Sequence, residues 1–152
     1  MILIAGGGAA VYFLSINPSG KVNAYVPPHL TAVQQAEYLA DHNNYQAAEN
    51  RWHQMLAQAT GEQTKMDIYY QQFALALKYK QYSDAQDYIN QEKKLDSSSS
   101  TPYESMAQLA QAQGKHSLAK SFWLQAINHL DPNLPQYGLL KQEYQSDMGN
   151  LN

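Results

Sequence analysis

The chain contains no cysteine and only one arginine, Arg51, among its 152 residues. Without cysteine it can form neither a disulfide framework nor a thiolate metal site, and it has no cysteine nucleophile. Charged residues make up 15% of the chain, against about 25% in a typical soluble domain. The net charge of −3 supplies no cluster of Lys and Arg for phosphate groups, so we expect no nucleic-acid partner.

Motifs for catalysis are also missing from the sequence. The five histidines are scattered, and there is no HExxH pair, no phosphate-binding glycine loop and no nucleophile elbow. The triplet Gly6-Gly7-Gly8 has neither the GxGxxG spacing nor a following Lys-Ser/Thr. Glu37 and Asp41 lie four residues apart on a predicted helix, where solvated carboxylates are common. We therefore predict a protein that is not an enzyme, with no catalytic residues, no metal site and no cofactor.

An uncharged, mostly apolar segment, residues 1–16, begins the chain. Its residues 2–16 (ILIAGGGAAVYFLSI) are slightly short for a membrane span, which needs about 17–25 apolar residues. Only Met1 precedes them, whereas a secretory signal begins with a basic region. Three interpretations stay open: a membrane anchor, a secretory signal, or a strand or helix packed on the rest of the chain.

Residues 17–29 (NPSGKVNAYVPPH) predict a linker. Asn-Pro, Ser-Gly and Pro-Pro are signals of turns and extended chain. The pair Pro27-Pro28 favours a stiff approach to the first helix. An apolar segment, a spacer and a folded module in this order are typical of a tethered protein.

Helical periodicity begins at Thr31 and predicts three helix–turn–helix units. The apolar residues recur at spacings of three and four, which places them on one face of each helix. The first unit breaks at His42-Asn43-Asn44 and ends near Thr60-Gly61. The second and third run from about 65 to 95 and 101 to 130, and a last helix spans about 134–147. The expected inner faces of the first unit are Val33, Ala36, Leu39 and Ala40, then Tyr45, Ala48, Trp52 and Met55.

A pattern recurs in these units with a period of about 34 residues, which is typical of one class of helical repeat. Tyr70, Tyr103 and Tyr137 recur at spacings of 33 and 34 residues. Ala48, Ala85 and Ala119 recur at spacings of 37 and 34, and the loop after the first unit can absorb the longer spacing. The clearest copy consists of Tyr103, Met106, Ala107 and Ala110, then Ala119, Trp123 and Ala126. The copy before it has Tyr70, Phe73, Ala74 and Leu77, then Ala85 and Ile89, with Glu92 where a small residue is expected. The pattern resembles the tetratricopeptide repeat, which has this period.

This resemblance implies an all-α fold, an α-solenoid of antiparallel helix pairs. Residues 30–133 would form three repeats, and residues 134–152 a capping helix and tail. The alternative is an ordinary seven-helix bundle with accidental spacing.

In the family, ligands lie in a concave groove formed by the first helix of each pair. The positions carried onto this chain are Val33, Glu37, Gln71, Leu75, Lys78, Glu104, Gln108 and Gln111. They lack the Lys, Asn and Arg of the clamp for chaperone C-termini, so we do not expect that ligand. The same residues are equally typical of a solvated helix face, and this interpretation stays open.

Two functions are compatible with the sequence. The first is a bacterial scaffold that is anchored in a membrane through residues 2–16, with its repeats outside the cytoplasm, and binds a protein or peptide in the groove. The second is a soluble, cytoplasmic module that self-associates into a homo-oligomer, with the apolar N-terminus packed within one copy or between copies.

Overall fold

The computed structural model describes residues 15–16, 22–23 and 26–151. Most of the predicted apolar segment, residues 1–14, lies outside the described residues. The chain divides into two compact units, Met1–Gln58 and Ala59–Asn152. In the first unit, β1 (Ser15–Ile16) and β2 (Val22–Asn23) pair antiparallel, with Ser15 opposite Asn23. The strand β2 lies inside the predicted linker.

One helix pair, α1 (Ala32–Asp41) and α2 (Tyr45–Gln58), completes the first unit. A capping box starts α1: the Gln34 amide donates to Thr31 Oγ1 over 3.3 Å, and the Thr31 amide donates to Gln34 Oε1 over 3.0 Å. The predicted inner faces are confirmed for Ala36, Leu39, Ala40, Ala48 and Trp52, which are buried. The prediction for Tyr45 is wrong: it is exposed, because it is the first residue of α2 and its hydroxyl donates to Asn43 Oδ1.

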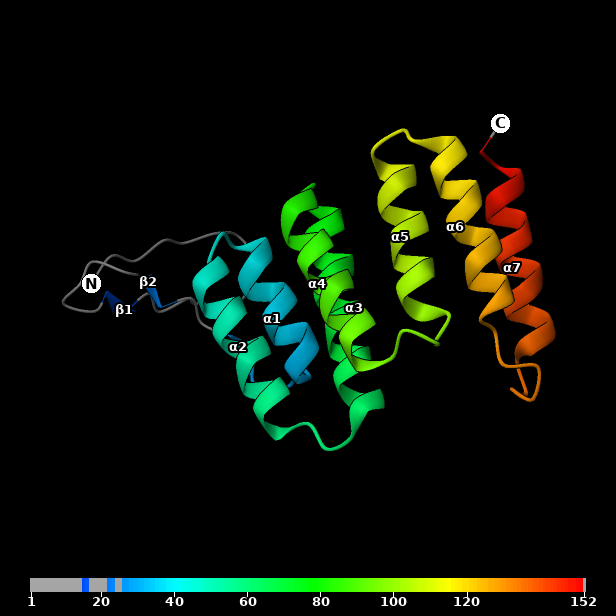
Figure 1. Ribbon diagram of the computed structural model, residues 1–152. Coiled ribbons are helices and arrows are strands. Elements are labelled where there is room, and N and C mark those ends of the chain that lie inside the picture. Colours follow the sequence, from blue (N-terminus) through cyan, green and yellow to red (C-terminus); the bar gives the residue numbers. More distant parts are fainter. Residues whose placement is uncertain (1–14, 17–21, 24–25, 152) are drawn as a thin grey trace. The chain divides into compact units, whose positions relative to one another are not determined.

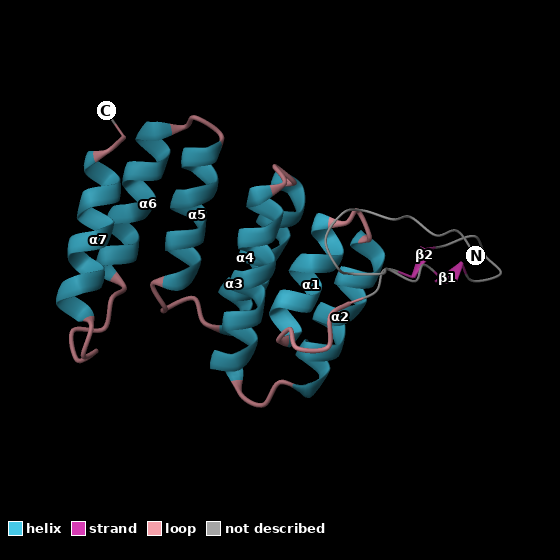
Figure 2. Ribbon diagram, turned by 180° about the vertical axis from the view of Figure 1, so that it is seen from behind, coloured by secondary structure: helices cyan, strands magenta, loops and turns pink. Residues whose placement is uncertain are grey.

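Five helices form the second unit: α3 (Glu62–Lys78), α4 (Tyr82–Leu95), α5 (Thr101–Ala112), α6 (His116–Asn128) and α7 (Tyr137–Gly149). Each helix packs against the next one along the chain, and α3 also contacts α5. In Figure 1 and, from behind, in Figure 2, α5, α6 and α7 lie side by side. The predicted all-α fold of adjacent helix pairs is confirmed for the described helical part of the chain.

The turns within the two pairs of this unit have the same geometry. Lys80, between α3 and α4, has a φ of 58°, and Gly114, between α5 and α6, has a φ of 72°. The next amide then reaches back to the preceding helix: the Gln81 amide donates to the Ala76 carbonyl, and the Lys115 amide to the Ala110 carbonyl. Positive φ is easy for glycine and strained for lysine. The same turn therefore occurs in two successive helix pairs, with an unstrained glycine in one and a strained lysine in the other.

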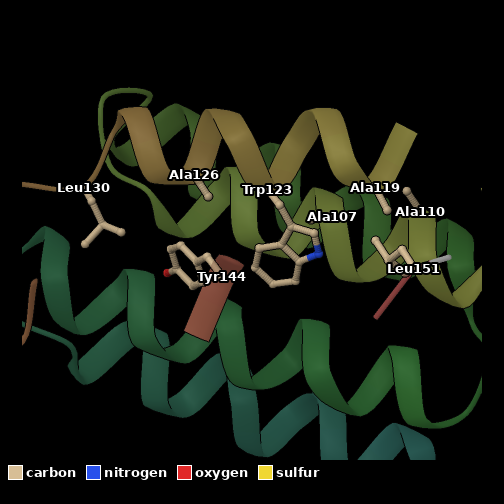
Figure 3. Close-up of a cluster of buried hydrophobic side chains, with 8 residues drawn as sticks. All are labelled: Ala107, Ala110, Ala119, Trp123, Ala126, Leu130, Tyr144 and Leu151. Carbon is tan, nitrogen blue, oxygen red and sulfur yellow. The ribbon is translucent and has the colours of Figure 1, made fainter. Parts of the chain in front are cut away.

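Trp123 lies at the centre of the larger core cluster, which Figure 3 shows. Alanines from α5 and α6 surround it, since only small side chains let the helices approach while leaving room for an indole. The Tyr144 ring of α7 closes the cluster, with its centroid 5.1 Å from that of the Trp123 ring. The cluster consists of Ala107, Ala110, Ala119, Trp123, Ala126, Leu130, Tyr144 and Leu151.

The second cluster joins α3 and α4 to α5, and it consists of Phe73, Ala76, Ala85, Ile89 and Leu109. Its first four members lie one repeat period before Ala107, Ala110, Ala119 and Trp123 of the first cluster. Ala74, which the repeat pattern assigned to a packing position, is exposed. The buried residues of α3 therefore correspond to residues of α5 that lie one full repeat period later in the sequence. This spacing is one residue longer than the spacing that matched Tyr70 with Tyr103.

The last helix begins at Tyr137, three residues after the predicted start at Leu134. Pro135 explains the difference, because a proline disfavours helical geometry in the residue before it. Residues 131–136 form turns, in which the Asp131 carboxylate accepts from the Asn133 amide over 2.9 Å.

Within the described residues, no helix combines the length and the apolarity that crossing a membrane requires. The segment proposed as an anchor lies almost wholly outside these residues.

Candidate functional site

The carboxylate of Glu104, on α5, accepts hydrogen bonds from three helices of the second unit. Its Oε1 accepts from the Tyr70 hydroxyl of α3 over 2.7 Å and from Gln108 Nε2 over 3.0 Å. Its Oε2 accepts from the Tyr144 hydroxyl of α7 over 2.6 Å. Gln108 Nε2 also lies 3.3 Å from the Tyr70 hydroxyl. We call these four residues the Glu104 cluster.

Helical geometry explains why these side chains meet. Glu104 and Gln108 are four residues apart and therefore neighbours on the surface of α5. Tyr70 lies 34 residues before Glu104, at the same position of the preceding helix pair. Tyr144 reaches the carboxylate because its ring is already held against Trp123. The cluster thus depends on the packing of three helices.

The two phenols of the cluster are held in their protonated, donating form. Burial, followed by the negative charge of Glu104, raises the pKa of Tyr70 well above its ordinary value. The same two causes, in the same order, raise the pKa of Tyr144. Both hydroxyls therefore remain hydrogen-bond donors to Glu104 across the physiological pH range.

A second carboxyl group, Glu92 on α4, is completely buried. Neither of its oxygens has a hydrogen-bond partner in the described part of the chain. Burial raises its pKa to about 8, the Ser105 hydroxyl partly opposes this rise without reaching hydrogen-bond geometry, and the charge of Glu104 adds to it. The Ser105 hydroxyl and Gln72 Oε1 are likewise buried and unpartnered. Burying a carboxyl group without partners costs free energy even when the group is neutral, and far more when it is charged.

The predicted groove residues are only partly brought together. Glu104 and Gln108 are half-buried members of the Glu104 cluster, and Gln111 is exposed one turn further along α5. On α3, Gln71 and Lys78 are exposed and Leu75 is half-buried, but the residue in contact with Glu104 is Tyr70. Val33 and Glu37 are half-buried on α1, in the first unit.

Three residues of the site are not among the predicted site residues. The repeat pattern assigns Tyr70 to packing, although an offset of 34 residues pairs it with Glu104. Tyr144 gives no repeat signal, since α7 has no second helix to confirm its register. Glu92 does give a signal, a charged residue where the repeat has a small one, and the structure shows that this departure is buried.

A separate pocket of about 140 Å³ lies between α4, α5 and α6, and it includes no predicted site residue. Its lining is mainly apolar and includes Met106, Leu109, Leu118 and Phe122. No three His, Cys, Asp or Glu side chains in the described part of the chain are placed to hold a metal ion.

No protein-family model and no curated protein matches this sequence.

Proposed function

We propose that the helix pairs form a tetratricopeptide-type solenoid that binds an extended polypeptide on the face carrying Tyr70, Glu104 and Gln108. The observation that supports this most is the Glu104 cluster, because it links equivalent positions 34 residues apart and includes two predicted groove residues. Buried packing positions at the same offset in α3–α4 and α5–α6 support the repeat itself. The proposed role is a non-catalytic scaffold.

The side chains next to the cluster suit an extended backbone. Gln71 and Gln111 are exposed, and a glutamine amide can both donate to a backbone carbonyl and accept from a backbone amide. Tyrosine offers a large contact area at a small entropic cost. These residue types favour a peptide ligand over a small apolar molecule.

Photo-crosslinking in cells tests the binding face. Benzoylphenylalanine in place of exposed Gln111 on α5 is expected to form an adduct with a polypeptide partner. The same group in place of Leu124, which is 51% exposed on α6, serves as the control and is expected to form none. An adduct at position 124 alone would move the binding surface to α6. An adduct between two copies of the chain would favour the self-associating module instead.

We further propose that residues 2–16 anchor the protein in a membrane, with the helices outside the cytoplasm. The support is the apolar sequence and the linker that follows it. Membrane fractionation of the full chain, compared with a chain that starts at Val22, tests the anchor. Full-length protein that stays in the soluble fraction without detergent would overturn it.

A further inference from the structure

The negative charge of Glu104 is surrounded by neutral donors. Its three hydrogen-bond partners are two phenols and an amide. In the described part of the chain, Glu104 forms no ion pair. The carboxylate is thus oriented by the fold but not neutralised by it, and the residue that carries it is only half-buried.

Three lysine ammonium groups of the second unit lie against tyrosine rings. The sequence of α5 contains neither lysine nor arginine. The ammonium group of Lys78 lies 5.3 Å from the centroid of the Tyr79 ring, and those of Lys93 and Lys141 lie 5.6 Å from the rings of Tyr103 and Tyr137. The helix that carries Glu104 therefore supplies no cation of its own to the carboxylate.

Glu92 provides a second, independent observation. It is completely buried with both carboxyl oxygens unpartnered, and its electrostatic interactions reach both Tyr70 and Glu104. Elsewhere on α3, Gln72 also has a buried carbonyl oxygen without a hydrogen-bond partner. A second acidic group therefore lies near Glu104, and neither of its oxygens is hydrogen-bonded in the described structure.

We propose that the Glu104 cluster is a subsite for one basic side chain, lysine or arginine, of the bound polypeptide. This inference rests on the proposed function, since it names the residue type that the peptide groove selects. A guanidinium or ammonium group makes charge-assisted hydrogen bonds to a carboxylate, which are about twice as strong as neutral ones. Because three hydrogen bonds already hold Glu104 in one orientation, little side-chain freedom is lost when the cation binds.

Selection from a random dodecapeptide library, with the full chain held in mild detergent, tests the proposal. The unmodified protein is expected to enrich lysine or arginine at one peptide position, and Glu104→Gln is expected to lose that preference. The matched control is Glu143→Gln, which removes the same charge from an exposed position of α7 and is expected to keep it. Circular dichroism of each variant checks that it is folded.

Affinities of one selected peptide give the quantitative test. Replacing its arginine by neutral citrulline is expected to weaken binding to the unmodified protein by at least about tenfold, and to have no such effect on Glu104→Gln. If Glu104→Gln does not fold, Tyr144→Phe takes its place: it removes one of the donors that orient the carboxylate and is expected to reduce the discrimination between arginine and citrulline. Discrimination equal to that of the unmodified protein would then overturn the subsite. Peptides without a basic preference, or the same preference in Glu104→Gln, would overturn the subsite and leave peptide binding intact. A library that yields no binder at all would overturn the proposed function as well.

Discussion

The pairs α3–α4 and α5–α6 are built on the same plan but place different side chains at one crossing. Trp123 and Ala126 lie three residues apart on α6, and Ile89 and Glu92 occupy the equivalent positions of α4. A very large and a very small side chain in one pair are replaced by two of intermediate size in the other. The summed volume of the two side chains is thus nearly the same in both helix pairs. The side chains themselves differ, since both are apolar in α6 whereas one of the two in α4 is ionisable. Packing density constrains the sum of the two side chains more tightly than either one.

The largest expected difference between the pairs is their response to pH. The pKa of Glu92 is about 8 in the folded chain, against an ordinary value of 4.5, so the folded state holds this proton more tightly than the unfolded state. The stability that this gives is complete below pH 4.5 and is lost as pH rises to about 8. The change is about 1.4 kcal/mol per pH unit within that window, and about 5 kcal/mol at most over all of it.

Chemical denaturation at pH 5, 6, 7 and 8 measures this effect. The free energy of unfolding is expected to fall with rising pH in the unmodified chain and to stay nearly level in Glu92→Gln. Tyr70 and Glu104, which face Glu92 from α3 and α5, are unchanged in both proteins. Asp96, whose hydrogen bonds to Ser98 lower its pKa, affects stability only at more acidic pH. The same slope in both proteins would show that Glu92 is not responsible.

Moving the ionisable residue to the other pair is expected to have the next largest effect. Ala126→Glu adds volume and a carboxyl group beside Trp123, and it should lower the free energy of unfolding by about 3–5 kcal/mol. The double change Trp123→Ile with Ala126→Glu recreates the side chains of α4, so its cost should be smaller than the sum of the two single costs. Leu124→Glu, at an exposed position of α6, is the control and should change stability by less than about 0.5 kcal/mol. If the cost of the double change equals the sum of the two single costs, the side chains at positions 123 and 126 do not compensate for each other's volume, and the prediction is wrong.

The reverse change should make α3–α4 resemble α5–α6 and stabilise the chain. Glu92→Met keeps most of the side-chain volume and removes the two unpartnered oxygens. At pH 7 we expect a gain of about 1–3 kcal/mol, because the desolvation cost of an unsatisfied polar group is removed. Thermal unfolding at pH 7 measures it, and a lower melting temperature would contradict the prediction.

The smallest expected effect concerns the turns. Lys80→Gly should stabilise α3–α4 by about 1 kcal/mol, since it relieves the left-handed backbone of a lysine. Gly114→Ala should destabilise α5–α6 by a similar amount, and a Cβ at that position would touch nothing within 4 Å, so only the backbone contributes. Denaturant midpoints of the two variants should shift in opposite directions, and a shift in the same direction would be the contrary result.

Much of the fold was predictable because the helix pairs bury residues at regular spacings. Ala107, Ala110, Ala119, Trp123 and Ala126 were all expected to pack, and all are buried. The exact register of α3 was not predictable, because Tyr70 matched Tyr103 at a spacing one residue short of the repeat. A shift of one residue in the register is small in the sequence, but it moves the predicted packing face by about 100° around the helix.

The site was less predictable than the fold. Glu104 and Gln108 were identified through the repeat, but the donors Tyr70 and Tyr144 come from two other helices, and Tyr144 lies outside any repeated pattern. The burial of Glu92 depends on the volume left by Ile89, which is a property of two positions together. Pairwise contacts of this kind are visible only when the helices are packed.

The position of Tyr144 in the sequence sets the order in which the hydrogen bonds of the Glu104 cluster can form during synthesis. As the ribosome makes the chain from its N-terminus, Tyr70 and Glu104 emerge first, and their carboxylate–phenol contact can form while α7 is still inside the exit tunnel. The second phenol arrives with the last helix, and the same ring then covers Trp123. During synthesis, the last donor to Glu104 and the ring that covers Trp123 are therefore supplied in the same late step, by one side chain.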